Sequence, residues 1–388
     1  MEWKEVTLEE IGTIVGGATP STKRTSFYDG DIPWLTPKDL SANSNKYIFR
    51  GERNITAEGF NSCSCKMLPK GSVLFSSRAP IGYVAIAASE MCTNQGFKSV
   101  IPNEDTDSEF LYYLLKYNKD NIVSQGSGTT FAEVSGKTMK GIEVVVPKEV
   151  DDQRRIASIL SSLDRKIELN NKINADLEEM AQTIFKNWFV DFEPFKDGKF
   201  VDSELGMIPE GWKVGTLDEI FSLKYGKNLS TSMILEKGDY PVYGANGIIG
   251  YYNEYNCDKY SVLVTSRGNG SGDVSRTHHP KSFITNNSFI VESLEQYKYI
   301  ELPFINGLFN IIDFKSYCSG SAQPQLTNKA MRNICIISPP MEIVIKYCEM
   351  LETLFSHIEC VIAENSRLSL LRDTLLPRLM SGEIEIPE

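Results

Sequence analysis

The sequence predicts a mixed α/β protein with two tandem homologous domains, joined by two long helices that form an antiparallel coiled coil. Three observations predict this fold class. The chain contains an internal repeat, each half ends in a long heptad stripe, and a segment rich in proline and glycine separates the halves. A chain of 388 residues is also too long for one hydrophobic core, which favours two or more domains.

The internal repeat is an ordered series of matching residues whose spacing drifts slowly. Near the start of the halves, residues recur 209 positions later: Trp3, Thr7, Leu8 and Ile11 return as Trp212, Thr216, Leu217 and Ile220. Near the end the spacing is 192, as in Lys137 and Lys329. An ordered series of this kind indicates two homologous copies that have diverged between their shared positions.

Each copy has the same plan, a mixed segment followed by a long helix. The mixed segments are rich in Gly, Asn, Ser and short β-like runs, and proline closes both. The predicted boundaries are a first domain at 1–150, a helix at 151–192, a linker at 193–211, a second domain at 212–338, a helix at 339–380 and a tail at 381–388.

Both helices carry apolar residues at alternating steps of four and three, the pattern of a coiled coil. The stripe positions are Leu160, Leu163, Ile167, Asn170 and Leu177 in the first helix, and Leu354, Ile358, Val361, Asn365 and Leu368 in the second. The two asparagines cost stability but can fix the register. Arg372 interrupts the second stripe. Each stripe could instead cover its own domain, but both helices are too long for one small domain.

Composition restricts the class of protein without identifying it. The net charge is −11, and the last 50 residues hold 9 acidic against only 4 basic residues. The rest is nearly neutral, which permits a local basic face for nucleic acid. No apolar run reaches the roughly 20 residues of a membrane span, and the first residues do not resemble a signal peptide. Eight scattered cysteines fit a reducing cytoplasm.

Motifs of catalysis are incomplete, so the sequence predicts no catalytic site, metal site or cofactor on this chain. Gly136-Lys137-Thr138 would need a glycine at position 131 to form a phosphate-binding loop, and Phe131 stands there. Ser338-Pro339-Pro340-Met341 lacks the aromatic residue of an amino-methyltransferase motif. His278 and His279 have a single further histidine, His357, in the chain, which disfavours a metal site.

Several short motifs together resemble one known family. They are the paired Trp-x-x-x-Thr-Leu openings, Pro209 to Trp212, Gln153 to Ala157, the run Phe185 to Phe192, and Leu375 to Gly382. Across essentially its whole length the chain resembles the DNA specificity subunit of Type I restriction–modification systems. The alternatives are a DNA methyltransferase or nuclease with its own recognition region, and a purely structural coiled-coil adaptor.

The resemblance implies a non-catalytic, cytoplasmic subunit that binds double-stranded DNA. Each domain would be a target-recognition domain that reads one half of a split target, which divergence of the copies would make asymmetric. The helices would space the domains and dock two methyltransferase subunits, which the restriction (nuclease–translocase) subunits join. S-adenosylmethionine, ATP and Mg²⁺ would then bind the partner subunits. The second helix lacks the Gln-Arg-Arg opening and aromatic ending of the first, so the equivalence of the methyltransferase contacts stays open.

Candidate DNA contacts are polar residues in or beside glycine-rich loops, since these side chains and backbone amides read bases and hold phosphates. In the first domain they are Lys23, Arg24, Lys38, Ser77, Arg78, Asn94, Gln95, Gln125, Ser127 and Thr129. In the second they are Lys227, Asn228, Tyr243, Asn246, Ser266, Arg267, Asn269, Ser321 and Gln323. Each could equally be a solvated turn. Arg78 and Arg267 occupy matching positions, which favours a phosphate or structural role over base reading.

Overall fold

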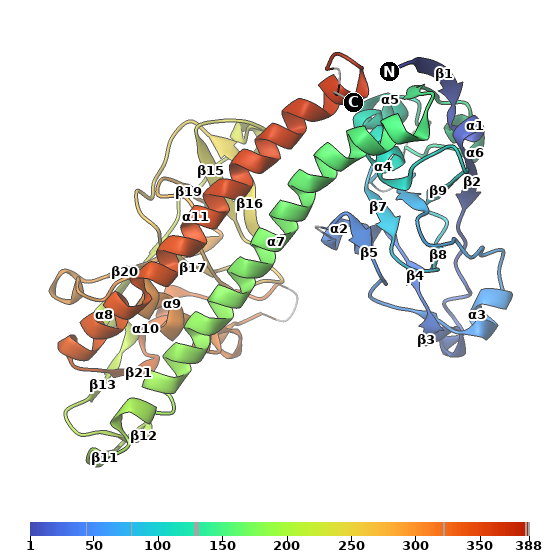
Figure 1. Ribbon diagram of the computed structural model, residues 1–388. Coiled ribbons are helices and arrows are strands. Elements are labelled where there is room, and N and C mark those ends of the chain that lie inside the picture. Colours follow the sequence, from blue (N-terminus) through green and yellow to red (C-terminus); the bar gives the residue numbers. More distant parts are fainter. Residues whose placement is uncertain (44, 79, 128–131, 321–322, 385, 387–388) are drawn as a thin grey trace. The chain divides into compact units, whose positions relative to one another are not determined.

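The computed structural model describes residues 1–388 except 44, 79, 128–131, 321–322, 385 and 387–388. The chain divides into two compact units, coloured along the sequence in Figure 1. Unit 1 comprises Met1–Leu169 and Asn365–Glu388, and unit 2 comprises Asn170–Glu364. Each unit therefore contains one mixed domain together with part of both long helices.

The domain of unit 1 is built on a five-stranded sheet with the order β2-β9-β6-β7-β5. Two strand pairs, β1 with β10 and β4 with β8, complete it. The strands are β1 (Trp3–Thr7), β2 (Gly12–Gly16), β3 (Tyr28–Ile32), β4 (Trp34–Leu35), β5 (Tyr47–Ile48), β6 (Val73–Phe75), β7 (Val84–Ala87), β8 (Cys92–Thr93), β9 (Lys98–Pro102) and β10 (Glu143–Pro147). The helices are α1 (Leu8–Ile11), α2 (Pro37–Ala42), α3 (Ala57–Asn61), α4 (Ser108–Tyr117), α5 (Lys119–Ser124) and α6 (Gly136–Lys140), with the short η1 (Thr25–Phe27).

The main core of unit 1 forms around α4. The helix is capped by Asp107, whose side chain accepts a hydrogen bond from the Phe110 backbone N–H at 2.9 Å. All its side chains from Phe110 to Leu115 are buried. They share one apolar cluster with sheet residues such as Phe75 and with Leu160 of the first long helix. Helix α4 therefore joins the sheet to the long helices by apolar burial.

The domain of unit 2 divides its strands among a four-stranded sheet, β14-β20-β17-β18, a three-stranded sheet, β16-β15-β19, and the pair β13-β21. The strands are β13 (Lys213–Thr216), β14 (Phe221–Tyr225), β15 (Tyr240–Gly244), β16 (Gly247–Tyr252), β17 (Val262–Thr265), β18 (Val274–Arg276), β19 (Phe283–Ile284), β20 (Ser288–Ser293) and β21 (Cys335–Ser338). The helices are α8 (Leu217–Ile220), α9 (Leu302–Ile311) and α10 (Asn328–Arg332), with the short η3 (Thr231–Met233), η4 (Glu295–Tyr297) and η5 (Phe314–Tyr317).

Matching backbone details confirm the internal repeat. At α1 the side chain of Glu10 accepts a hydrogen bond from the Thr7 backbone N–H at 2.6 Å. At α8 Glu219 accepts from Thr216 in the same way at 2.9 Å. Both are capping boxes, which satisfy free N–H groups at a helix start. In each domain the strand before this helix pairs antiparallel with the strand before a long helix, β1 with β10 and β13 with β21.

Both long helices are present, each with 40 residues: α7 (Val150–Phe189) and α11 (Met341–Met380). The sequence predicted them at 151–192 and 339–380. Within unit 1, Leu160 of α7 shares an apolar cluster with Leu379 and Met380 of α11. Within unit 2, the Phe185 ring of α7 lies 5.8 Å from the Tyr347 ring of α11. Early residues of α7 thus meet late residues of α11, and the pairing is antiparallel.

Polar residues on the stripes make specific contacts between the two helices. Asn170 is 1% exposed, and its side-chain amide donates to Glu364 at 2.7 Å. Arg372, which interrupts the second stripe, forms an ion pair with Asp164 of α7 at 2.8 Å. Asp164 also accepts a hydrogen bond from the Tyr113 hydroxyl at 2.5 Å. Arg372 interrupts the apolar pattern because a buried carboxylate on α7 faces it.

The other predicted stripe residues lie at several depths between or beside the helices. Those that are buried are Leu160, Ile358 and Val361. Those that are half-buried are Leu163, Ile167, Leu177, Leu354, Asn365 and Leu368. Among the described residues, no helix combines the length and hydrophobicity needed to cross a membrane.

The segment 193–211, predicted as a linker, is structured. It contains η2 (Glu193–Phe195) and a β-hairpin of β11 (Phe200–Ser203) and β12 (Gly206–Pro209). Gly206 at the turn has φ +93°, a conformation that glycine adopts without steric cost. Ile208 is buried, and Phe195 packs edge-on against Trp212 at 5.1 Å. The proline and glycine residues correctly indicated turns in this segment. They did not indicate that its aromatic side chains pack together.

Candidate nucleic-acid interface

In unit 1 the candidate interface is centred on the residues that follow β6. The Ser77 backbone N–H donates to Gly96 at 2.7 Å, and its carbonyl accepts from Val134 at 2.9 Å. Arg78, the next residue, forms an isolated β-bridge with Glu133. The turn after β8 and the loop that ends at Val134 are thus both attached to the end of β6. Ser127 also forms a β-bridge with Glu133, so three of the predicted segments come together, those containing Arg78, Asn94-Gln95 and Gln125-Ser127.

The same arrangement is present in unit 2 after β17. The Ser266 backbone N–H donates to Asn287 at 2.7 Å, and its carbonyl accepts from Leu326 at 2.9 Å. Arg267 forms an isolated β-bridge with Gln325, as Arg78 does with Glu133. The sequence match between the two arginines therefore reflects one shared backbone framework.

The two frameworks differ in charge. In unit 1 Glu133 pairs with Arg78 at 3.5 Å and with Lys98 at 3.4 Å. In unit 2 the matching position is Gln325, which carries no charge. Arg267 is exposed and forms no ion pair with any residue in the described part of the chain. An uncompensated guanidinium attracts a phosphate more strongly than one that already faces a carboxylate.

Sequence reasoning missed Glu133 and Lys98, although one signal could have revealed them. Glu133 and Gln325 are separated by the same 192 residues as the other late matches of the repeat. A carboxylate at one of these matched positions and a neutral amide at the other indicates that the electrostatic potential around the shared arginine differs between the two domains.

Three of the predicted contact residues are buried, namely Ser77, Tyr243 and Ser266, which are at most 3% exposed. The Tyr243 hydroxyl accepts a hydrogen bond from the His278 backbone N–H at 2.9 Å. Burial leaves these three side chains little surface with which to contact DNA, so their assignment as contacts stays a prediction. At Ser77 and Ser266 it is the backbone that holds the framework. Sequence alone does not show the burial of Ser77 and Ser266, because it depends on contacts with distant residues such as Val134 and Leu326.

Most of the other predicted residues are exposed in the structure. The exposed residues are Lys23, Arg24, Lys38, Gln95, Gln125, Ser127, Lys227, Asn228, Asn246, Arg267, Asn269 and Gln323, while Arg78 and Asn94 are half-buried. Thr129 and Ser321 lie outside the described residues. An exposed polar side chain is available to DNA, so these residues remain candidates and not established contacts.

Two candidates, the exposed Lys38 and the half-buried Asn94, already have partners within the domain. Lys38 forms an ion pair with Glu52 at 2.6 Å, and both side chains are largely exposed. The Asn94 side chain accepts a hydrogen bond from the Gly96 backbone N–H at 2.8 Å. Exposed pairs of this kind contribute little to stability and exchange readily with solvent or a ligand. Asn94 acts mainly as the support of its own turn.

The histidine pair in unit 2 is half-buried. Among the described residues, no group of three or more His, Cys, Asp or Glu side chains could hold a metal ion. Burial lowers the pKa of His278 to about 4, and neighbouring Arg276 and His279 act in the same direction. His278 is therefore neutral at pH 7 and contributes no positive charge to a DNA interface.

This depressed pKa predicts a loss of stability in acid. An unfolded His278 has a pKa near 6.5, so the unfolded chain binds the proton more tightly than the folded chain. The contribution to the free energy of unfolding is fully present above pH 6.5 and falls by about 2–3 kcal/mol as the pH approaches 4. Urea unfolding at pH 7 and 4.5 should show a smaller acid loss for His278→Gln than for the wild type. Equal losses in both proteins would contradict this.

The fold and the paired interfaces define a class of protein: a tandem two-domain protein with one framework repeated on two domains that share a helix pair. The sequence model described as "Type I restriction modification DNA specificity domain" matches residues 1–179 and 209–369. The chain is 35% identical to the Type I restriction enzyme MjaIX specificity subunit of Methanocaldococcus jannaschii, over all of this chain and 94% of that protein. The chain therefore belongs to the family of Type I restriction–modification DNA specificity subunits.

More distant relatives extend the comparison. The Type I restriction enzyme EcoprrI specificity subunit of Escherichia coli is 25% identical over 95% of this chain and 90% of that protein. The fold is similar to the crystal structure of the Type I S subunit from M. genitalium, with a TM-score of 0.54, 20% identity and coverage of 98% of this chain and 96% of that chain. The predicted resemblance and fold class are confirmed, and the reading as a non-catalytic specificity subunit is favoured over a methyltransferase or nuclease.

Proposed function

We propose that this chain binds a bipartite, asymmetric target in double-stranded DNA, one half with each domain, and docks the catalytic subunits of a Type I complex on its helices. The repeated framework around Arg78 and Arg267 carries this proposal. Two equivalent frameworks suit two half-sites, and their different charge, with Glu133 matched by Gln325, suits two different half-sites.

Apolar residues exposed on the helices support docking of two methyltransferase subunits. In unit 1, Leu169 of α7 is 54% exposed and Leu370 of α11 is 70% exposed. In unit 2, Met180 and Met350 are 53% and 45% exposed. A partner protein that covered these side chains would bury apolar surface, as the core of a protein–protein interface does.

The remaining assignments follow from this role. The restriction subunits would join the methyltransferase core, and S-adenosylmethionine, ATP and Mg²⁺ would bind these partners. The complex would act on DNA in the cytoplasm. Because the chain has a net charge of −11, we expect tight specific binding mainly after the methyltransferase subunits have joined.

The test is DNA binding and adenine methylation by the chain alone and by its complex with methyltransferase subunits. The complex should methylate one split sequence, and the chain alone should bind the same duplex much more weakly. A chain with Leu370→Asp should fold but recruit less methyltransferase. Methyl transfer by the chain alone, or no DNA retention by the complex, would contradict the proposed function.

A single arginine should separate phosphate binding in the two domains. Arg267→Ala is expected to weaken binding at all sequences and to reduce the slope of log affinity against log salt by about 1. Arg78→Ala, the matched control, should change the slope less because Glu133 already compensates its charge. Fluorescence anisotropy of the complex at several salt concentrations measures both. Equal slope changes would contradict the assigned charge difference.

A further inference from the structure

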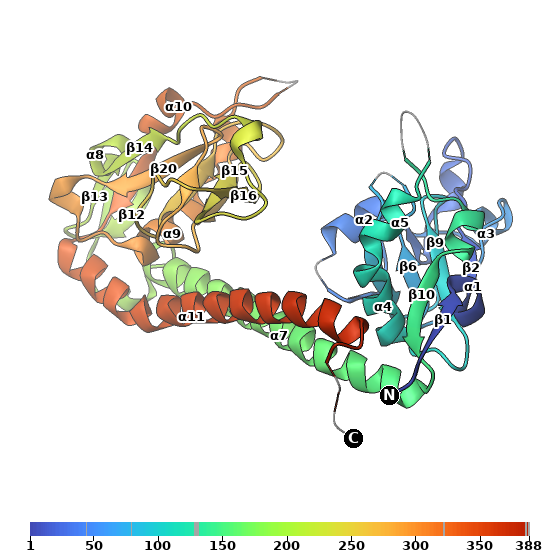
Figure 2. The ribbon, with the colours of Figure 1, turned by 90° about the horizontal axis from the view of Figure 1, so that it is seen from above.

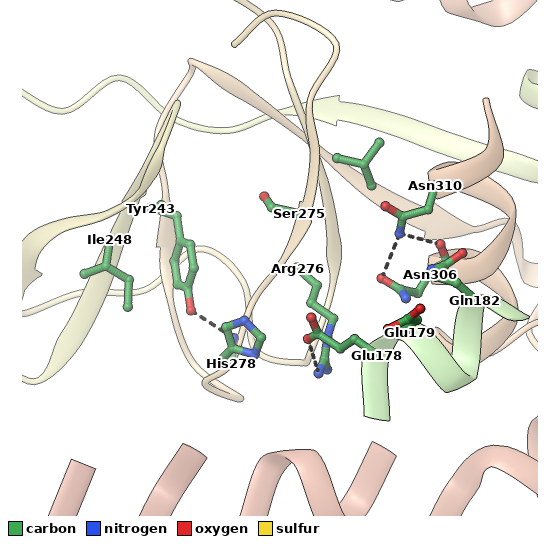
Figure 3. Close-up of a pocket in the computed structure, with 12 residues that line it drawn as sticks. Glu178, Glu179, Gln182, Tyr243, Ile248, Ser275, Arg276, His278, Asn306 and Asn310 are labelled. Atoms are coloured by element: carbon green, nitrogen blue, oxygen red, sulfur yellow. Dashed lines mark hydrogen bonds and ion pairs between the residues drawn. The ribbon is translucent and has the colours of Figure 1, made fainter. Parts of the chain in front are cut away.

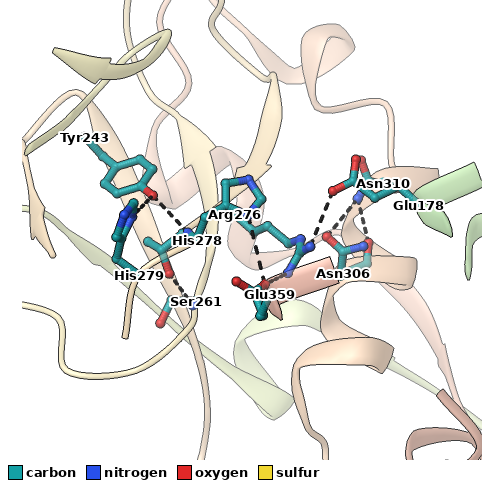
Figure 4. Close-up of polar contacts among 10 residues, drawn as sticks. Glu178, Tyr243, Ser261, Arg276, His278, His279, Asn306, Asn310 and Glu359 are labelled. Carbon is teal, nitrogen blue, oxygen red and sulfur yellow. Dashed lines mark hydrogen bonds and ion pairs between the residues drawn. The ribbon is translucent and has the colours of Figure 1, made fainter. Parts of the chain in front are cut away.

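One arginine of the second domain contacts both long helices within unit 2. Arg276 ends β18 and is 5% exposed. Its guanidinium donates to Glu359 of α11 at 2.5 Å and lies 3.4 Å from a Glu178 carboxylate oxygen on α7 (Figure 4). It also lies 5.1 Å from the centre of the Phe355 ring of α11. Because a guanidinium is planar and its donors are fixed in direction, these contacts define an orientation as well as an attraction.

The surroundings of Arg276 make this connection specific. Burial raises the pKa of Glu359, and Arg276 opposes that effect. Without the arginine, Glu359 and Glu178 would repel one another, and Glu359 would be a buried carboxylate without its cation. Breaking a buried pair on one side is costly, so this connection favours one arrangement of the domain on the helices.

A second, apolar connection lies elsewhere in the same interface. The Phe185 ring of α7 packs edge-on against Phe304 of α9 at 5.5 Å. It also approaches Gly307 so closely that a side chain there would overlap the ring. Apolar packing holds surfaces together but is less directional than a charged hydrogen bond.

A cavity of about 550 Å³ lies beside α7 in this interface. Its lining includes Glu178 and Gln182 of α7, Arg276 of β18, and Asn306 and Asn310 of α9 (Figure 3). Close packing of the domain on α7 is therefore interrupted at this place. With Arg276 removed, the domain would keep its apolar connection at Phe185 and would have open space beside it in which to turn.

We propose that Arg276 is a positioning residue that holds the second recognition domain in one direction on the helix pair. This rests on the proposed function, in which the direction of each domain determines which separation of half-sites can be bound. One base pair adds about 3.4 Å and a rotation along the duplex, so a fixed domain rejects a wrong spacing and a turning domain tolerates it.

The experiment compares wild-type complex and Arg276→Gln complex, each with methyltransferase subunits, on duplexes with the natural spacing and one base pair more or fewer. Arg276→Gln should lose about tenfold in affinity at the natural spacing, because only a fraction of domains has the competent orientation. It should also lose about tenfold in discrimination against the wrong spacings. Lys298→Gln, which removes an exposed pair with Glu295, is the matched control and should change neither value.

The pattern over spacings distinguishes positioning from a general structural role. A merely structural defect lowers the active fraction and weakens binding equally at every spacing, and that result would overturn the proposal. If Arg276→Gln does not fold, Glu178→Gln removes only the half-exposed α7 side and should give a smaller loss of discrimination. Unchanged discrimination in this variant would likewise overturn it. Failure of the wild-type complex to bind any spacing specifically would instead contradict the proposed function.

Discussion

Exchange of residues 1–150 for the matching domain of another family member is expected to change one half of the DNA target and to leave the other half unchanged. In unit 1 these residues form their own sheet, and β1 and β10 pair at the two ends of the segment. Affinity for the original complete target should fall by about 10³-fold or more, because specific binding exceeds non-specific binding by that factor. Mapping of methylated adenines measures the change directly.

The design of the exchange follows from contacts of the domain with α7. The incoming domain should carry a lysine at the position of Lys46. The Lys46 ammonium donates to Ser161 of α7 at 2.8 Å and pairs with Glu109 at 2.9 Å. The reciprocal control, exchange of residues 212–338, should change only the other half of the target. A chimera that folds but recognises a target altered in both halves would contradict the modular reading.

The large elements could be predicted from sequence because each depends on a repeated local pattern. Heptad spacing over 40 residues predicts a long helix whatever surrounds it, and α7 and α11 begin and end within three residues of the expected positions. The repeat predicted that Arg78 and Arg267 are equivalent, because homologous copies keep a common backbone framework.

The buried polar contacts could not be predicted, because they depend on pairing between distant residues. Lys46 and Arg276 are ordinary cations in the sequence, yet both are almost fully buried against carboxylates. Ser77 and Ser266 have the composition of surface turns, yet both are buried, and their carbonyls accept hydrogen bonds from Val134 and Leu326, more than 50 residues later. The spacing of apolar residues, two in a strand and 3.6 in a helix, shows which face of the element is buried. It does not show which distant residue packs against that face.

Arg372 illustrates what the heptad pattern can and cannot predict. The sequence showed that Arg372 interrupts the second apolar stripe, but it did not show why a charged residue stands there. Asp164 on α7, whose side chain is only 9% exposed, supplies that reason through the ion pair at 2.8 Å. Such a pair costs desolvation of both groups and favours one register of the two helices in unit 1.

Replacement of Asp164 with alanine is therefore expected to lower the free energy of unfolding by about 2–3 kcal/mol. The variant would leave Arg372, 21% exposed, with the exposed carboxylate of Asp373 as its remaining ion-pair partner. It would also remove the acceptor of the buried Tyr113 hydroxyl, which adds a cost of its own. Urea unfolding followed by circular dichroism measures the loss.

Two matched variants show whether the loss comes from the broken ion pair between the helices. The double variant Asp164→Leu with Arg372→Met should recover the part of the loss that the broken ion pair causes, because apolar residues of similar size can replace a buried pair at little cost. It should keep the part that the Tyr113 hydroxyl causes. Lys38→Ala, which breaks an exposed pair with Glu52, should change the free energy by less than about 1 kcal/mol. A loss below about 1 kcal/mol for Asp164→Ala would show that other contacts, and not this pair, fix the helices in register within unit 1.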